Sequence, residues 1–383
     1  MVRDPLRIAC VTGEPSGDLL AALVAAGIRE QAPEAVFEGI GGPRLLEQGF
    51  NALYPMSKLA VNGYAEVLMH LPELLSIRRH LKQHWSAHRP AVMVGVDAPD
   101  FNFNLELHLR RQGVPTVHFI GPSLWAWRGE RMRQIREAVS RMLVVFPFET
   151  VLYQEAGVPV SYVGHPLASV VPMDPDRAAA RTRLGLDQAA RVLALMPGSR
   201  ASEVRQLGSR FLAAAQRLQR KDPGLQIVAP MANAERQAEF LAQARQLGLN
   251  EVLCPIGGSH DALAACNAVM VASGTATLEA ALFKRPMVIS YVLSRLSYWI
   301  MKRQAYLPWV GLPNILCRDF VVPELLQDAA TPVALAEAGW QALTDERQAQ
   351  RLYQRFSALH DTLRRDTPAL AAQAILEVAN RGA

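Results

Sequence analysis

The sequence predicts an α/β fold of two domains, each a parallel sheet covered by helices, that face each other across a cleft. Three observations lead to this prediction. Short apolar, β-rich segments alternate with helical patterns along the chain, which is typical of buried parallel sheets. The chain has 383 residues, more than one core usually accommodates. Residues 166–187, with three prolines and mixed charges, separate two similar halves and have the composition of a linker.

The apolar segments predict ten strands, six before the linker and four after it. From residue 331 onward the pattern is helical and amphipathic, without further strands. We therefore expect one Rossmann-like domain over residues 1–168, a second over 169–347, and C-terminal helices over 348–383 for which packing back on the first domain is one arrangement. The expected strands are residues 7–12, 36–40, 91–96, 116–120, 142–146, 160–163, 192–196, 226–229, 268–272 and 287–290.

The composition is that of a folded enzyme, with 50% hydrophobic and 20% charged residues. The net charge of +5 suits an anionic substrate or membrane surface, but it lacks the dense basic stripe of a nucleic-acid-binding protein. Four scattered cysteines without a CxxC pair argue against structural zinc and disulfides. Because no secretion signal and no apolar run of about 18 residues is found, we expect a cytoplasmic protein with at most peripheral membrane contact.

The loops that follow the strands are the candidate sites, because parallel sheets bind ligands beyond the carboxyl ends of their strands. Residues 13–18 read Gly-Glu-Pro-Ser-Gly-Asp, where Ser16 offers a hydroxyl at a helix N-terminus that favours an anion. The glycine-rich residues 39–44 follow the second strand in the same way. Both loops also suit simple capped turns. Neither is a GxGxxG motif, which weakens a dinucleotide-binding interpretation.

Two further loops of the first half carry chemically useful side chains. Asp97 and Asp100 follow the strand at residues 91–96, where a carboxylate can act as a base toward an acceptor hydroxyl. Asp100 equally suits a helix cap. Trp125 and Trp127 lie beside Arg128, a combination that suits stacking on a sugar or acyl chain together with a phosphate contact. The alternative is that both tryptophans brace the loop against the core.

The second half gives sharper signals. The strand at residues 192–196 ends in Pro-Gly198-Ser199-Arg200, where backbone N–H groups, a hydroxyl, a guanidinium and a helix N-terminus form a cradle for a pyrophosphate. The GK[ST] ending of a P-loop is missing, which disfavours ATP hydrolysis.

The strand at residues 268–272 leads into Ser273-Gly274-Thr275, small residues that let a nucleotide approach the next helix. Glu279 lies about one turn into that helix and can accept hydrogen bonds from both ribose hydroxyls, because a carboxylate in an otherwise apolar helix needs a partner. A capping box formed with a preceding threonine is the alternative. Asn314, in a Gly-Leu-Pro-Asn segment, supplies an amide that is a weak candidate by itself.

Taken together, these motifs resemble lipid A disaccharide synthases. GEPSGD, GGPRL, DAPDFN, PSLWAW, PGSR, SGTATLE and LPN occur in the order seen in that family, from Gly13 nearly to the C-terminal helices. One departure is Gly121, where the family pattern has a serine before PSxWAW, so this chain offers no side-chain hydroxyl there.

The resemblance implies an inverting glycosyltransferase of the GT-B type in lipid A and lipopolysaccharide biosynthesis. Such a hexosyltransferase joins UDP-2,3-diacylglucosamine to 2,3-diacylglucosamine 1-phosphate, giving the β-1,6-linked disaccharide 1-phosphate and UDP. The first domain would then bind the acceptor and the second the UDP-sugar. The resemblance assigns Asp97 as the base, Arg200 to the diphosphate, Glu279 to the ribose and Asn314 to the LPN motif, and it implies neither a metal nor a cofactor.

Both substrates carry acyl chains, so an apolar surface is expected. Val67, Leu68, Leu71 and Leu75 share one helical face, with Arg78 and further basic residues following, as in a peripheral helix on the anionic inner face of the inner membrane. An ordinary core helix has the same pattern. Residues 294–303 are a second candidate, or else a subunit interface, and some family members form dimers.

Two other functions fit parts of this pattern. A UDP-GlcNAc 2-epimerase, or another sugar-nucleotide enzyme with the same architecture, needs no acyl-chain surface. A sugar-nucleotide or lipid-binding module would keep the fold without the chemistry. Turnover of an unacylated UDP-sugar distinguishes the first from a lipid A disaccharide synthase, and any turnover excludes the second.

Overall fold

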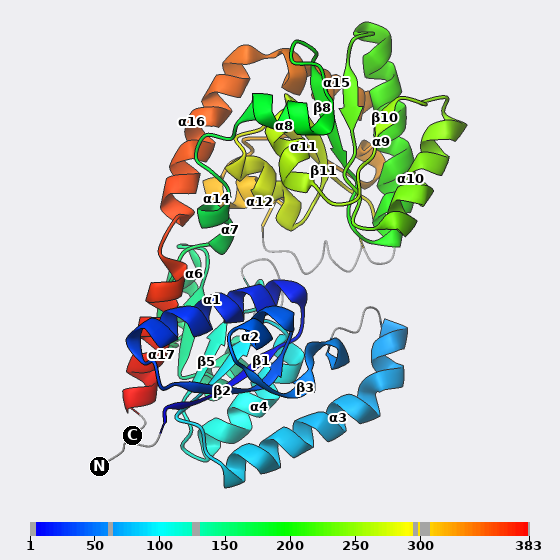
Figure 1. Cartoon of the computed structure of the whole chain (residues 1–383). Coiled ribbons are helices and arrows are strands. Elements are labelled where there is room, and N and C mark those ends of the chain that lie inside the picture. The colour runs from blue at the N-terminus through cyan, green and yellow to red at the C-terminus, as the bar shows by residue number, and fades with distance from the viewer. Residues whose placement is uncertain (1–4, 60–63, 125–130, 294–297, 299–306, 382–383) are drawn as a thin grey trace. The chain divides into compact units, whose positions relative to one another are not determined.

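The computed structural model of the chain describes residues 5–59, 64–124, 131–293, 298 and 307–381 (Figure 1). It divides into two compact units. Unit 1 comprises residues 1–166 together with 363–383, and unit 2 comprises residues 167–362. Each unit is built around its own parallel sheet. The chain therefore enters unit 2 once, near the start of the predicted linker, and returns to unit 1 for its last helix.

The sheet of unit 1 has the strand order β3-β2-β1-β4-β5-β6-β7, and all its pairs are parallel. Its strands are β1 (Arg7–Thr12), β2 (Val36–Gly41), β3 (Asn51–Pro55), β4 (Val92–Val96), β5 (Thr116–Phe119), β6 (Arg141–Val144) and β7 (Val160–Tyr162). Its helices are α1 (Pro15–Gln31), α2 (Pro43–Glu47), α3 (Tyr64–Ala87), α4 (Pro99–Arg111), α5 (Met132–Ala138), α6 (Glu149–Glu155) and α17 (Thr367–Arg381), with a 3-10 turn at Met56–Lys58.

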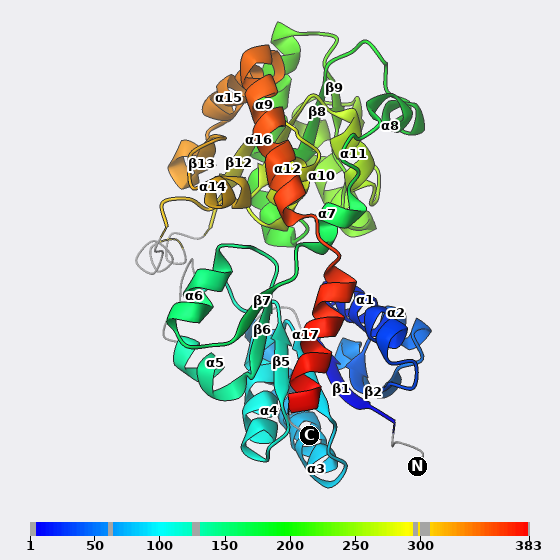
Figure 2. The ribbon, with the colours of Figure 1, turned by 90° about the vertical axis from the view of Figure 1, so that its left-hand side faces the viewer.

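Helices cover both faces of this sheet. Helices α1 and α17 lie side by side on one face, while α3 and α4 lie together on the other (Figures 1 and 2). Between these two helices and the sheet, the core contains the fully buried Leu81 and Trp85 of α3 and Met93 of β4. Helix α17 is held at the sheet by Arg141, whose Nη1 donates to Glu377 Oε2 at 2.7 Å.

The sheet of unit 2 has the order β10-β9-β8-β11-β12-β13 and is also parallel throughout. Its strands are β8 (Val192–Met196), β9 (Gln226–Val228), β10 (Val252–Leu253), β11 (Ala268–Ala272), β12 (Met287–Tyr291) and β13 (Glu324–Leu326). Its helices are α7 (Pro166–Val170), α8 (Arg177–Leu184), α9 (Ala201–Lys221), α10 (Ala234–Gln246), α11 (Ser259–Ala265), α12 (Thr275–Leu282), α14 (Leu312–Cys317), α15 (Pro332–Thr344) and α16 (Glu346–Leu363), with a 3-10 turn at Gln327–Ala329.

All ten predicted strands are present, with ends within about two residues of the expected ones. The three strands that the sequence did not reveal, β3, β10 and β13, lie at sheet edges. They are short, and β3 and β13 are half-buried at best, so they lack the continuous apolar pattern of the central strands. An edge strand pairs with only one neighbour and can be covered on only one face. Its sequence therefore contains fewer apolar residues than that of a central strand.

The two C-terminal helices belong to different units, whereas the sequence placed them in one segment, residues 348–383. Helix α17 packs on unit 1, but α16 is part of unit 2. The buried His360 of α16 explains this, because its Nε2 lies 2.7 Å from the carbonyl oxygen of Ala168 and its Nδ1 lies 2.8 Å from Lys284 Nζ. Burial lowers the pKa of Lys284 to about 8.

A buried carboxylate joins the two glycine-rich loops of unit 1. Asp18, in the first turn of α1, accepts hydrogen bonds from the backbone N–H groups of Gly42 at 2.7 Å, Arg44 at 2.9 Å and Leu45 at 3.3 Å. These are N-terminal groups of α2, which have no partner within that helix. The aspartate of GEPSGD therefore caps the helix of the GGPRL motif. These hydrogen bonds join the two motifs.

We expect Asp18→Ala to lower the free energy of unfolding by roughly 2–4 kcal/mol, because three N–H groups would lose a charged acceptor in a buried place. Urea unfolding of the full chain measures this. Asp176→Ala is the matched control, since Asp176 caps α8 through one exposed hydrogen bond to Ala179 N. An equal, small loss for both variants would contradict the anchoring role of Asp18.

Candidate functional site

A pocket of about 380 Å³ lies at the carboxyl edge of the unit 2 sheet. Its size falls within the range of small-molecule sites. Strands β8 and β11 are neighbours, so the loops that follow them open on the same space. Seven of the eight residues predicted for donor binding line this pocket, namely Gly198, Ser199, Arg200, Ser273, Gly274, Thr275 and Glu279. Loops after β9 and β10 complete it with Pro230, Met231, Ala232, Gly257 and Ser259.

The loop after β8 has the predicted N–H groups and guanidinium, but the carboxylate of Glu203, which was not predicted to do so, binds them. Glu203 Oε2 accepts from the backbone N–H of Ser199 at 3.1 Å and of Arg200 at 3.2 Å. Its other oxygen lies 3.2 Å from Arg200 Nη1, and the Arg200 side chain is 75% exposed. A carboxylate thus holds the N–H groups and guanidinium that suit a phosphate. Tyr291, at the end of β12, lies beside Arg200, and burial raises its pKa.

The loop after β11 brings Glu279 to the pocket. No side chain caps α12, so the capping-box alternative is not what is seen, and Thr277 Oγ1 instead donates to Gly274 O at 2.7 Å. Glu279 Oε2 lies 3.5 Å from Nε2 of His260, whose ring packs against Phe283 with 5.2 Å between centroids. The hydrogen bond to Glu279 raises the pKa of His260. His260, on α11, was not predicted, because nothing local connects it to Glu279.

Asn314 does not line this pocket. Its buried Nδ2 donates to Val322 O at 2.9 Å and to Glu324 Oε1 at 2.8 Å, and its Oδ1 accepts from the N–H groups of Val321 at 2.9 Å and Val322 at 3.0 Å. These four bonds use the full capacity of a primary amide. In this arrangement Asn314 holds the chain between α14 and β13, and a ligand contact by Asn314 stays a prediction.

In unit 1, Asp97 occupies a sharp turn between β4 and α4. Asp97 and Ala98 both have left-handed backbones, with φ of 52° and 45°, which costs energy in residues other than glycine and is frequent at functional sites. The loop after β1 meets this turn, because a Cβ on Gly13 would lie 2.9 Å from that of Ala98. The turn presents the half-buried Asp97 side chain at the carboxyl edge of the sheet.

Other candidates of unit 1 are less fully described. Asp100 is exposed in the first turn of α4 and pairs with Arg131 at 2.6 Å, and Ser16 is exposed at the start of α1. Trp125, Trp127 and Arg128 lie outside the described residues.

The absence of a side chain at Gly121 has a clear physical reason. A side chain at this position would collide with the hydroxyl of the buried Tyr153 and with the end of Met142. The space that a serine would need is therefore filled from within the unit. This explains the departure from the family pattern noted above by local packing around Tyr153.

The predicted acyl-chain helix is α3. Leu71 and Leu75, one turn apart, are 41% and 42% exposed, whereas Ile77 and Leu81 further along are buried. The first half of α3 thus differs from an ordinary core helix. The side chains of Val67 and Leu68 lie outside the described residues, as does nearly all of the second candidate, residues 294–303. Within the described residues, no helix has both the length and the apolar character needed to span a bilayer.

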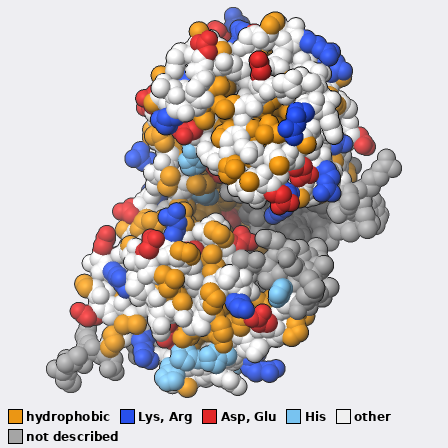
Figure 3. All heavy atoms as spheres, turned by 45° about the vertical axis from the view of Figure 1, so that its right-hand side comes forward, with side chains coloured by type: hydrophobic (Ala, Val, Ile, Leu, Met, Phe, Trp, Pro, Cys, Tyr) orange, Lys and Arg blue, Asp and Glu red, His pale blue; other side chains and the backbone are white. Residues whose placement is uncertain are grey.

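Charged side chains of both signs are interspersed on the face shown in Figure 3. Among the described residues there is no group of three or more His, Cys, Asp or Glu side chains with metal-site geometry.

The chain matches the family model described as lipid-A-disaccharide synthetase over residues 8–375. The lipid-A-disaccharide synthase of Bordetella pertussis is 59% identical over 391 residues, covering 99% of this chain and 100% of that protein. Among solved structures, a UDP-GlcNAc 2-epimerase from Neisseria meningitidis bound to UDP-GlcNAc is 12% identical with a TM-score of 0.62, covering 98% of this chain and 100% of that chain. MurG from Acinetobacter baumannii is 13% identical with a TM-score of 0.58, covering 98% and 99%.

The two solved structures, at these identities, show likeness of fold alone. They confirm the predicted class of two Rossmann-like domains of the GT-B type.

We expect Glu279→Gln to return the pKa of His260 toward its ordinary value of 6.5, because the hydrogen bond to the carboxylate is the main cause of the upward shift. The raised pKa means that the stabilisation by this pair is present below pH 6.5 and is lost as the pH rises through the shifted pKa of His260. NMR titration of the imidazole measures the shift. Asp261→Asn should lower it less, and an unchanged pKa in Glu279→Gln would refute the pairing.

Proposed function

The chain belongs to the lipid-A-disaccharide synthetase family and is a glycosyltransferase, and we propose that its unit 2 pocket holds the uridine diphosphate of the sugar donor. The reaction joins UDP-2,3-diacylglucosamine to 2,3-diacylglucosamine 1-phosphate and releases UDP. One observation carries the proposal: the loops after two neighbouring strands bring Arg200 and Glu279 to the same pocket.

The pocket offers two complementary kinds of chemistry. Around Arg200, backbone N–H groups and the N-terminus of the long helix α9 favour the negative diphosphate. The exposed Arg200 side chain can leave Glu203 for a phosphate oxygen, since an exposed ion pair is weak. In the same pocket, Glu279 accepts from the ribose hydroxyls while His260 orients it. The departing diphosphate is thereby stabilised by the N-terminus of α9 and a guanidinium.

Asp97 acts as the general base in a single displacement. Its carboxylate takes the proton of the acceptor 6-hydroxyl as that oxygen attacks the anomeric carbon, and the bond to the diphosphate oxygen breaks with its electron pair going to UDP. Attack from the face opposite the leaving group inverts the anomeric carbon and gives the β-1,6 linkage. The half-buried side chain of Asp97, at a strand end, suits access by an acceptor.

The acyl chains are accommodated at the first half of α3, where Leu71 and Leu75 are exposed and basic residues follow. An exposed leucine face next to Arg78 and Arg79 suits an anionic lipid surface. We propose that the protein associates peripherally with the cytoplasmic face of the inner membrane through this segment.

Incubation of the protein with both diacylated substrates and EDTA tests the function. We expect a tetraacyl disaccharide 1-phosphate by mass spectrometry, because the diphosphate is stabilised by the protein's own groups. The control reaction contains unacylated UDP-GlcNAc in place of the donor and should be far slower. Equal turnover of the unacylated sugar nucleotide, without a disaccharide, would favour the 2-epimerase instead.

A further inference from the structure

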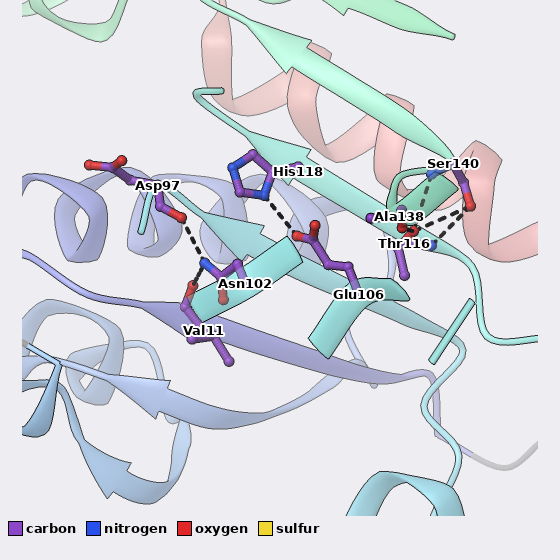
Figure 4. A network of polar contacts seen from close by, with 8 residues as sticks. All are labelled: Val11, Asp97, Asn102, Glu106, Thr116, His118, Ala138 and Ser140. Carbon is purple, nitrogen blue, oxygen red and sulfur yellow. Dashed lines mark hydrogen bonds and ion pairs between the residues drawn. The ribbon is translucent and has the colours of Figure 1, made fainter. Parts of the chain in front are cut away.

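A buried polar network lies directly beneath the Asp97 turn (Figure 4). It consists of Asn102 and Glu106 on α4 and His118 on β5, and all three side chains are fully buried. Burial of polar side chains is costly unless they are bonded to fixed partners. The network lies behind the proposed base, and the reaction assigns it no role.

Asn102 is the member of this group that bonds to the turn. Its Nδ2 donates to the carbonyl oxygen of Asp97 at 2.7 Å and lies 3.4 Å from the carbonyl oxygen of Val11. The first bond ties down the left-handed residue itself, and the second ties it to the end of β1. In Figure 4 the backbone of Asp97 faces Asn102, while the Asp97 carboxylate points away from it. The direction of the carboxylate therefore depends on a backbone conformation that Asn102 holds.

Glu106 and His118 form a second buried pair, close to Asn102. Glu106, one helical turn later, lies 2.8 Å from His118 Nδ1 through its Oε1. Asn102 Oδ1, Glu106 Oε2 and His118 Nε2 are buried without a hydrogen bond. Burial raises the pKa of Glu106. Gly95, paired with His118 across the sheet, makes this arrangement fit, because a Cβ there would collide with Glu106 and crowd Asn102.

In a purely structural core such buried polar side chains would be unfavourable, because apolar residues of the same size avoid their desolvation cost. A left-handed pair of non-glycine residues also persists only where surrounding contacts determine it. The desolvation cost and the backbone strain both occur next to one side chain, that of Asp97.

We propose that Asn102 is a positioning residue for the glycosyl transfer step: it holds the strained Asp97 turn so that the carboxylate meets the acceptor hydroxyl. This inference rests on the proposed role of Asp97 as the base.

The test compares steady-state kinetics of Asn102→Ala and of the isosteric Asn102→Asp with those of the parent protein. We expect kcat to fall roughly 100-fold in both variants, because a misplacement on the order of 1 Å has that effect. The KM values of both substrates should stay within about threefold, since substrate binding does not depend on the direction of the base. Asn102→Asp keeps the shape of the side chain but removes the donor, and thermal unfolding of both variants shows that each is folded before kcat is compared.

Thr116→Val is the matched control. Thr116 is fully buried in the same unit, and its hydroxyl donates to Ala138 O at 2.7 Å, a bond to backbone comparable with that of Asn102 (Figure 4). Its loss should reduce thermal stability and leave kcat unchanged. A wild-type kcat in both Asn102 variants, or a rise in KM alone, would overturn the positioning role.

The Asp97→Asn variant separates this inference from the proposed function. Inactive Asp97→Asn together with active Asn102 variants would overturn only the role of Asn102. Full activity of Asp97→Asn would remove the base on which the inference rests.

Discussion

Parallel pairing of adjacent strands is the constraint on which the site depends. In unit 2, Leu195 of β8 lies opposite Met270 of β11, so both strands end at the same edge. The residues that follow must then share one space, whatever their separation in the chain. This is why Arg200 and Glu279, which come from different loops and helices, line one pocket. The N-termini of α9 and α12 follow these strands, which adds N–H groups where an anion would lie.

The same constraint operates in unit 1, with a different result. Val11 of β1 is paired with Gly95 of β4, so the loop of Gly13 reaches the turn of Asp97. Asn102 bonds the ends of both strands there. Unit 2 thus offers donors for a negative ligand, while unit 1 offers a carboxylate on a strained and well-supported turn. The proposed function assigns donor binding to unit 2 and the base to unit 1, the two contributions that a glycosyl transfer by single displacement requires.

The central strands and the strand-end loops could be predicted because buried parallel strands are continuous apolar runs that end abruptly at glycine and polar residues. The edge strand β10 has only two residues, too few for a pattern. The partners of Asp18, Glu279 and Asn314 were also beyond the sequence, because each depends on the tertiary structure. The pairing of Glu203 with Arg200 was not predicted, although the i, i+3 spacing of the two residues is a usable signal. Helix α16 could not be assigned to a unit from its amphipathic pattern, because that pattern shows which face is buried but not which unit covers it.

Hydrogen–deuterium exchange with and without UDP tests the central claim most directly, because it reports on backbone N–H groups in each unit separately. UDP should slow exchange in residues 199–204 and 274–279, at the starts of α9 and α12, and should leave the turn at residues 97–102 unchanged. Slower exchange confined to the loops of unit 1, with no change at residues 199–204, would contradict a nucleotide site in unit 2.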